Sequence, residues 1–423
     1  MSNLTSPASA PIWTATPDIT LQVNSVAVSA NGNCCVFGTS NEFGTGQFAV
    51  YCYDAAGNKL WSNTVGADNS TQGVFWVAAS ADGQFVAAGG ETSKTVGFLT
   101  AYRVADGSPV LNIATKYRIN QVVLSGDGSL LLAVFEDQVQ LYSYANGAYT
   151  LASQQTLAGS YCNSCALSPD GFTAVVSCTI YSDSDTKNSK STLGAREALA
   201  SSASTGQVVS FSISGNQLAI SGAWASPVGV MRVAIAATGN YWGASLHDGS
   251  CVLFNPSNVH TPLWQYKPAL GNLSVAYGFD ITQTAAGRVV LACGANLYAA
   301  SPVPTPPPPG GYLYLVESVA SGSSEAPQFL WGQDLMYSAN PGVSLDREAQ
   351  TVTATDGQPG DETSTPVKES AGNFYLFDAA AGTELWSFPT PVMNWPMAIT
   401  PDGAHAFGGS DDGSVYFWGP AAA

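Results

Sequence analysis

Few residues in this sequence have the types and spacing that chemistry at a site requires. The three histidines, His247, His260 and His405, are too few and too scattered to form a metal centre with one another. None has a serine or acidic partner in a sequence pattern, so no Ser–His–Asp triad is predicted. A hydrolase or lyase that works with carboxylates alone leaves no such pattern and stays open as an alternative.

The cysteines are scattered along the chain, which indicates buried small apolar residues rather than a disulfide framework. Cys162 and Cys165 have the Cys-x-x-Cys spacing of redox and zinc sites. They are followed by Ala166, where a haem-attachment motif has histidine, and no second pair completes a zinc site. The eight cysteines are Cys34, Cys35, Cys52, Cys162, Cys165, Cys178, Cys251 and Cys293.

Acidic residues on expected loops offer the hard oxygen ligands that calcium prefers. The candidates are Asp183, Asp185, Asp356 and Asp361. They complete no known calcium-binding loop, and solvated acidic loops are the expected default. No metal or cofactor is therefore predicted, with calcium and pyrroloquinoline quinone (PQQ) as the alternatives.

The elements that would position these residues follow a repeat. An apolar strand, a turn rich in Ser, Asp and Gly, and a second apolar strand recur along the chain. The turns centre on Gly32, Gly83, Gly128, Gly171, Gly239, Gly287, Ala349 and Gly403. A four-stranded propeller blade takes about 40–50 residues, so the sequence predicts an all-β, eight-bladed β-propeller spanning 1–423 as one domain. The copy at Ala349 is degenerate, and without it the number of blades is seven.

The two ends of the chain are predicted to close the ring together. The last unit ends with no room for a fourth strand, so blade 8 is expected to combine 392–420 with 11–17. Ile12-Trp13 matches the Leu-Trp pairs of other outer strands, and such closure leaves no free sheet edge. Those pairs are Leu60-Trp61, Leu263-Trp264, Leu330-Trp331 and Leu385-Trp386.

Two motifs carry a family resemblance. The segment from Asp54 to Gly57 followed by Trp61, and Asp378 with Gly382 and Trp386, resemble the PQQ-like propeller repeat. The Ser-Pro-Asp-Gly turns are similar to those of WD40-like bacterial propellers. The resemblance implies that the tryptophans dock each blade on its neighbour.

The resembled family includes quinoprotein dehydrogenases and a non-catalytic assembly scaffold, so it implies a fold and no single function. In the dehydrogenases a vicinal disulfide lies against the cofactor. Cys34-Cys35 is such a pair by sequence, but it aligns with the expected core residues Phe85-Val86. The resemblance therefore leaves a quinoprotein-like enzyme as an alternative only.

The longest insertions all fall between the second and third strands (B and C) of their blades, which places them on one face. They cover 181–207, 299–311 and 354–372. Loops gathered on one face of a rigid scaffold often carry function. Alignment of the blades predicts a pocket rim at the channel mouth, in which Arg232 and Asp280 of adjacent blades pair. The rim candidates are Trp76, Arg118, Tyr161, Arg232, Trp242, Asp280 and Trp395.

The composition limits the kinds of partner that we expect this protein to bind. The formal net charge is −17, with 13 Lys and Arg against 30 Asp and Glu, and such a surface repels nucleic acid. No apolar run is long enough to span a membrane. No signal peptide is visible, so we expect either a cytoplasmic protein or one exported with its signal removed.

We expect a non-enzymatic binding or scaffold protein that uses the B–C loop face for a protein or small ligand. One alternative is an enzyme with its pocket at the channel mouth, either a quinoprotein-like oxidoreductase or a metal-assisted hydrolase or lyase. A second alternative is a carbohydrate-binding propeller that uses rim aromatics such as Trp76 and Trp395.

Overall fold

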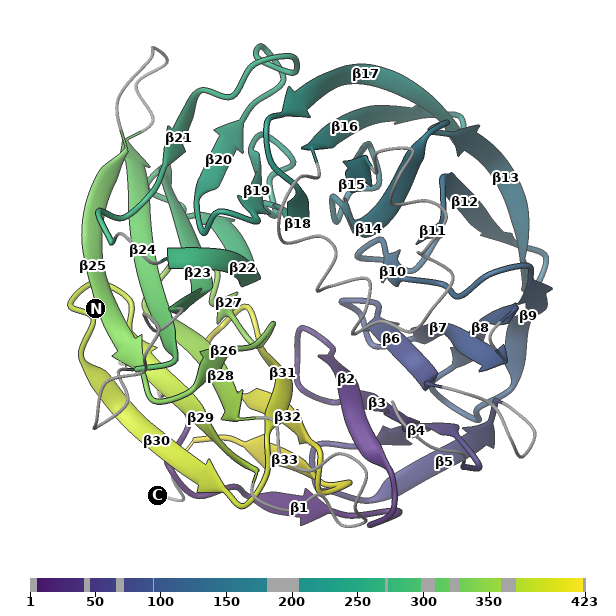
Figure 1. The fold of residues 1–423 in the computed structure, drawn as a ribbon. Coiled ribbons are helices and arrows are strands. Elements are labelled where there is room, and N and C mark those ends of the chain that lie inside the picture. The colour runs from purple at the N-terminus through teal and green to yellow at the C-terminus, as the bar shows by residue number, and fades with distance from the viewer. Residues whose placement is uncertain are drawn as a thin grey trace.

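The described residues form eight antiparallel sheets around a central axis (Figure 1). This computed structural model describes residues 6–41, 46–65, 72–93, 95–180, 205–270, 273–297, 309–319, 327–358 and 370–420. Seven sheets have four strands, and in the eighth the innermost strand is divided into two short pieces. The prediction of an eight-bladed propeller is therefore confirmed, including the degenerate blade.

The first four blades follow one another along the chain, and the strands of each run in order from the axis outwards. Blade 1 contains β2 (Gln22–Val28), β3 (Cys35–Ser40), β4 (Ala49–Tyr53) and β5 (Lys59–Thr64). Blade 2 contains β6 (Gly73–Ala79), β7 (Phe85–Ser93), β8 (Val96–Arg103) and β9 (Pro109–Thr115). Blade 3 contains β10 (Gln121–Leu124), β11 (Leu130–Phe135), β12 (Gln138–Ala145) and β13 (Ala148–Thr156). Blade 4 contains β14 (Ser160–Leu167), β15 (Thr173–Ile180), β16 (Thr205–Ser214) and β17 (Gln217–Ser226).

The last four blades complete the circle. Blade 5 contains β18 (Val230–Ile235), β19 (Trp242–Leu246), β20 (Cys251–Phe254) and β21 (Trp264–Tyr266). Blade 6 contains β22 (Leu273–Gln283), β23 (Arg288–Leu297), β24 (Gly311–Val319) and β25 (Gln328–Leu335). Blade 7 contains β26 (Ser338–Ala339), β27 (Ser344–Leu345), β28 (Thr351–Gln358), β29 (Ala371–Asp378) and β30 (Glu384–Thr390). Blade 8 contains β31 (Asn394–Ile399), β32 (Ala406–Ser410), β33 (Val415–Trp418) and β1 (Trp13–Ala15).

The N-terminal strand closes the ring, as predicted. β1 pairs antiparallel with β33, with Trp13 opposite Phe417. An isolated bridge between Pro7 and Pro420 extends this pairing, so the segments at these two prolines lie side by side.

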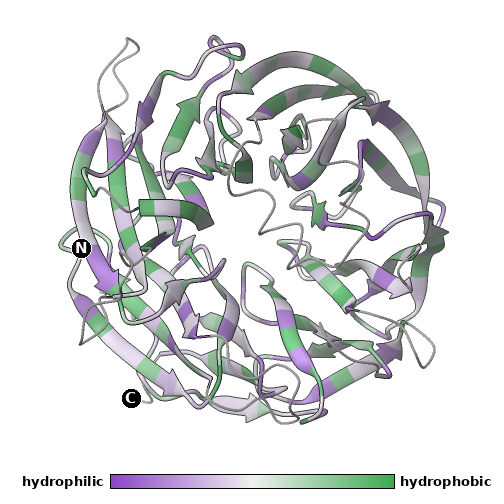
Figure 2. Cartoon of the chain, viewed as in Figure 1, coloured by the Kyte–Doolittle hydropathy of each residue, from purple (hydrophilic) through white to green (hydrophobic). Residues whose placement is uncertain are grey.

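The hydrophobic core lies between neighbouring blades. The second strand of a blade is covered on both sides, and every residue of β3, β11, β19 and β32 is buried. Apolar residues occur in all eight blades and are interspersed with polar ones along outer strands (Figure 2). This arrangement explains why the inner sequence pattern is almost continuously apolar.

The Ser-x-Asp-Gly turns join the first and second strands through their side chains. In blade 2 the Ser80 hydroxyl accepts the N–H of Phe85 (3.0 Å) and donates to Asp82 (2.6 Å). Gly83 has a φ of +72°, which glycine adopts without strain. Neighbouring turns are linked by backbone hydrogen bonds, such as Asp82 N–H to Gly126 O (3.2 Å). We call the face with these turns the lower face, and the face with the B–C and D–A connections the upper face.

Two insertion boundaries differ from the sequence expectation. β28 continues to Gln358, so this strand ends later than an insertion beginning at Ala354 requires. Thr355, Asp356 and Gly357 look like loop residues, but each pairs with β29 in regular register. β16 likewise begins at Thr205, inside the expected 181–207 insertion. The structure describes no helix that is long and apolar enough to cross a membrane.

Candidate functional site

Irregularities in the innermost strands shape the surroundings of the axis. The pairing register shifts near the upper end of β2, β6, β14, β18, β22 and β31. Each shift is a β-bulge, which leaves one or more residues unpaired and re-aims the side chains around it. In β6 the shift lies between Val74 and Trp76 and leaves Phe75 as the extra residue.

Arg118 lies at the centre of a polar cluster on the upper face. It precedes β10, and its Cζ lies 4.1 Å from the centroid of the Phe75 ring. Its Nε donates to Asn120 Oδ1 (3.2 Å), its Nη2 to the Tyr161 hydroxyl (3.4 Å) and its Nη1 to Gln72 Oε1. We call Arg118 and these four neighbours the Arg118 cluster, which draws on blades 2 and 4 and on the connections that enter blades 2 and 3.

The cluster holds its guanidinium in place with neutral groups. Tyr161 donates to Asn120 Oδ1 (3.0 Å), and Asn120 donates to the Cys162 carbonyl (2.7 Å). The ion pairs of the described residues are Lys267–Asp248 and Arg288–Glu317, and neither involves Arg118. An arginine stacked on an aromatic ring with no carboxylate partner is suited to receive an anionic group.

Gln72 adds backbone strain to the cluster. Its φ is +63°, a conformation that is uncommon for a residue other than glycine. The side chain is buried and its amide oxygen faces Arg118. Strain of this kind persists where the surrounding structure fixes a residue for a purpose, often at a binding site.

Trp76 and Arg232 meet although they belong to blades 2 and 5. The Arg232 Cζ lies 4.6 Å from the Trp76 ring centroid, a cation–π geometry. Both side chains are half-buried, and they fill part of the space around the axis. Burial raises the pKa of the Cys165 thiol, and the charge of Arg232 opposes this only in part. Cys165 is therefore not an activated nucleophile.

The predicted pairing of Arg232 with Asp280 does not form. Asp280 instead accepts the backbone N–H of Leu345 in the next blade (2.7 Å) and of Ile281 (2.8 Å). Burial raises its pKa to about 6, although these hydrogen bonds oppose the shift. Asp280 thus acts as a latch between blades 6 and 7.

Serines that, like Asp280, stand about seven residues before the turn glycine link other blades in the same way. Ser25 accepts the N–H of Val77 (2.7 Å), and Ser164 accepts that of Val233 (3.2 Å). Val77 and Val233 belong to innermost strands, which have a strand partner on one side only, and the side chain of the preceding blade accepts the N–H group on the other side. Asp280, one of the predicted rim residues, therefore links two blades as these serines do.

The two remaining rim candidates do not join the Arg118 cluster. Trp242 belongs to β19 and is only 2% exposed, because a second strand is covered on both sides. Its ring stacks on Phe254, with centroids 6.4 Å apart, so its placement on the rim is wrong. Trp395 lies half-buried in β31, and its Nε1 has no hydrogen-bond partner among the described residues.

Of the calcium candidates, only Asp356 is described, and it is fully buried in β28. Its carboxylate accepts the N–H of Tyr337 (3.0 Å) and of Asn373 (2.7 Å), the Asn373 amide (3.0 Å) and the Tyr375 hydroxyl (2.8 Å). Four donors leave this carboxylate no free direction for a metal. Asp183, Asp185 and Asp361 lie outside the described residues.

The cysteines are buried thiols. Cys34 and Cys35 lie in the core, as their alignment with Phe85-Val86 predicts. The closest sulfur pairs are Cys162 with Cys178 (3.4 Å) and Cys34 with Cys52 (3.7 Å), and all eight cysteines are free. The described residues contain no group of three or more His, Cys, Asp or Glu that could hold a metal ion.

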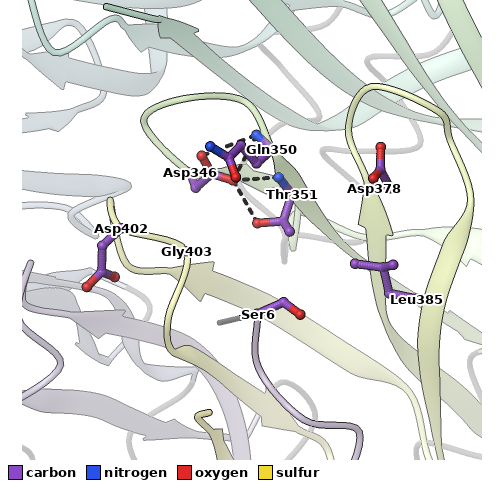
Figure 3. A pocket seen from close by; sticks show the side chains of 8 residues that line it. All are labelled: Ser6, Asp346, Gln350, Thr351, Asp378, Leu385, Asp402 and Gly403. Atoms are coloured by element: carbon purple, nitrogen blue, oxygen red, sulfur yellow. Dashed lines mark hydrogen bonds between the residues drawn. The ribbon is translucent and has the colours of Figure 1, made fainter. Parts of the chain in front are cut away.

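Two hollows lie away from the axis. One, of about 740 Å³, opens between blades 6 and 7 and reaches the upper face. The other, of about 220 Å³, lies on the lower face between blades 7 and 8 and is acidic (Figure 3). In the lower hollow Asp346 accepts the N–H groups of Gln350 (3.0 Å) and Thr351. This aspartate therefore stabilises the turn to which it belongs.

Sequence reasoning missed Gln72, Phe75 and Asn120, because their contacts join separate blades. The one available signal was Asn120, a polar residue directly before an apolar inner strand. Of the seven rim candidates, the structure brings together Arg118 with Tyr161, and Trp76 with Arg232.

Comparisons with known proteins support the fold and go no further. No family model matches this chain, and no curated protein matches it by sequence. Among solved structures, Kuenenia stuttgartiensis hydrazine synthase is similar, with a TM-score of 0.54 and 12% sequence identity. The match covers 82% of this chain and 96% of the other. At this identity the two share a fold, and nothing follows about activity.

Proposed function

We propose that this protein is a non-catalytic binding propeller that holds an anionic group of its ligand against Arg118 on the upper face. The supporting observation is the half-buried guanidinium of Arg118, which is held by neutral acceptors and stacked on Phe75. Arg118 forms no ion pair with a described carboxylate, and unlike the exposed Arg103 it is half-buried and stacked on a ring. A carboxylate of a small ligand or of a partner protein fits it chemically.

The architecture supports binding at this place. The cluster takes side chains from several blades, so its geometry is fixed by the ring rather than by one loop. It lies on the same face as the B–C insertions, where partner recognition is expected.

We also propose that the blades are PQQ-like repeats. Four tryptophans of outer strands each donate Nε1–H to a backbone carbonyl of the following blade. The pairs are Trp13 with Ala55 (3.0 Å), Trp61 with Val104 (2.8 Å), Trp331 with Ala379 (2.8 Å) and Trp386 with Pro7 (3.0 Å). These contacts support the repeat resemblance, and they carry no implication of cofactor binding.

The alternatives have less support in the part of the chain that the structure describes. No histidine there forms a hydrogen bond to a serine or a carboxylate, as a triad requires. One face of Trp76 is already covered by Arg232, which limits stacking against a sugar ring. Neither observation favours an enzyme or a lectin over an anion-binding propeller.

The test is a titration with succinate, sulfate and inorganic phosphate, followed by calorimetry and by the thermal midpoint. The wild type should bind at least one of these anions saturably, and Arg118→Gln should bind it at least about tenfold more weakly. Arg118→Lys keeps the charge but loses the planar guanidinium that can donate two parallel hydrogen bonds, and it should bind with intermediate affinity.

Arg103→Ala is the matched control. Arg103 is an arginine of the lower face that donates to Tyr144 (2.6 Å) and packs against its ring, and its loss should leave anion binding unchanged. The proposal is wrong if no anion binds saturably, or if Arg118→Gln and Arg103→Ala behave alike.

A further inference from the structure

The larger hollow, between blades 6 and 7, is a groove whose two walls come from different blades. One wall is the β25–β26 connection from Asp334 to Ser338, and the other includes the ends of β28 and β29. Glu384 and Ser387 of β30 continue this second wall along the outside of the blade. The volume of about 740 Å³ exceeds what one small ion needs and lies in the usual range of ligand sites.

Negative charge lines this groove. Asp334 and Glu384 are exposed carboxylates on opposite walls, and no Lys or Arg is among its described lining residues. Next to Asp334, Met336 is 63% exposed, which places an apolar surface beside the charge. Charged and apolar contacts in one groove suit a long side chain that ends in a cation.

A buried carboxyl group lies behind the groove floor. Tyr375 lines the groove, and its hydroxyl donates to Asp356 (2.8 Å), which is fully buried. Burial raises the pKa of Asp356, and its hydrogen bonds oppose that shift. Only donors face this carboxylate, an arrangement that fits its ionised form, and all of them are neutral. No cation is among its hydrogen-bond partners, so the ionised carboxylate adds an uncompensated negative charge behind the groove floor.

We infer that the groove between blades 6 and 7 binds an extended peptide segment that carries lysine or arginine. The cation would lie between Asp334 and Glu384, above the Tyr375 ring edge, and the aliphatic stem would lie along Met336. The site is separate from the Arg118 cluster and opposite to it in charge. One partner with an acidic and a basic segment would be able to use both.

The test uses fluorescence anisotropy of a labelled acetyl-Gly-Lys-Gly-Arg-Gly-amide peptide. The wild type should bind it saturably and should not bind the peptide with Glu in place of Lys and Arg. The double variant Asp334→Asn with Glu384→Gln should weaken binding by about tenfold or more. Ser387→Trp fills the groove from an exposed strand position without a change of charge, and should weaken binding comparably.

A second double variant controls for the overall charge. Asp106→Asn with Glu348→Gln removes the same two charges outside the groove and should leave binding within about twofold of the wild type. Arg118→Gln should also bind the peptide normally, which separates this site from the proposed function. The inference is overturned by an absence of binding, by equal losses in the two double variants, or by normal binding in Ser387→Trp. Displacement of the peptide by magnesium alone at equal concentration would also overturn it, because the groove would then be a metal site.

Discussion

At the scale of residues, several aspartates of this protein stabilise turns by accepting hydrogen bonds within them. The pKa of Asp54 is lowered mainly by hydrogen bonds from Asn58. Burial opposes ionisation of Asp127, but hydrogen bonds from Ser129 and Ser125 outweigh it and lower the pKa. These carboxylates stabilise the fold above their ordinary pKa, and that stability is lost as they are protonated at low pH.

Asp280 behaves in the opposite way, and Asp280→Asn tests this. Its raised pKa of about 6 means that the folded protein binds a proton more tightly there than the unfolded chain does. Its ionisation therefore destabilises the fold as pH rises from about 4 to about 6. Relative to wild type, Asp280→Asn should gain stability over this window, by about 3 kcal/mol in all. Urea unfolding at several pH values measures the difference.

Asp127→Asn is the matched control for that experiment. Its pKa is lowered from 3.8, so the same measurement extended below pH 4 should show stability lost, relative to wild type, as pH rises towards about 4, with little change above it. A difference between Asp280→Asn and wild type that does not vary with pH would contradict the assigned role of Asp280.

The residues of the site were only partly predictable from the sequence. Alignment of the blades on their turn glycines puts Asp280 at the same position as Ser25 and Ser164, and all three side chains accept an N–H of the next blade. It did not distinguish a latch from a binding residue, because both are polar residues in an apolar strand. Trp242 was misplaced for a related reason: an aromatic residue near a turn looks like a rim residue until the covering blade is known.

At the scale of elements, the tryptophan and glycine of the repeat act between blades rather than within one. Gly57, Gly107 and Gly382 all have positive φ, and each is packed against a tryptophan of the preceding blade. A Cβ at Gly107 would lie 2.7 Å from Cγ of Trp61. The sequence shows both residues in blades 1 and 7, but only the structure shows that a tryptophan meets the glycine of the next blade.

Gly107→Ala should therefore destabilise the protein by more than backbone strain alone. Gly215 is the matched control, because it also has positive φ in the corresponding turn of blade 4, but a Cβ added there would meet no atom within 4 Å. Gly215→Ala should cost about 1 kcal/mol, and Gly107→Ala about 3 kcal/mol, because only the latter also displaces Trp61. Chemical denaturation of both variants measures these costs. Equal costs would show that Trp61 does not depend on the glycine.

At the scale of the whole molecule, the two faces differ in what many of their charged side chains do. Aspartates of the A–B and C–D turns gather on the lower face, whereas Arg118 and Arg232 lie near the axis towards the upper face. The eight blades were predictable because the strand–turn–strand pattern occurs once in each blade, so each copy indicates the same local packing. The binding surfaces were not, because each is built where different blades meet and no repeat encodes it.

Ring closure provides the last test. β1 contributes the strand pairing with β33, the stacking of Trp13 on Phe417 (5.2 Å) and its hydrogen bond to Ala55. Deletion of residues 1–17 removes all three and exposes the edge of β33, so the free energy of unfolding should fall on the order of 5 kcal/mol. Joining residues 6–17 after residue 420 through a short glycine turn should restore it, because Pro7 and Pro420 are already neighbours. Calorimetry of both chains measures the effect. Equal melting of the truncated and full-length chains would mean that the seven complete blades hold the ring without β1.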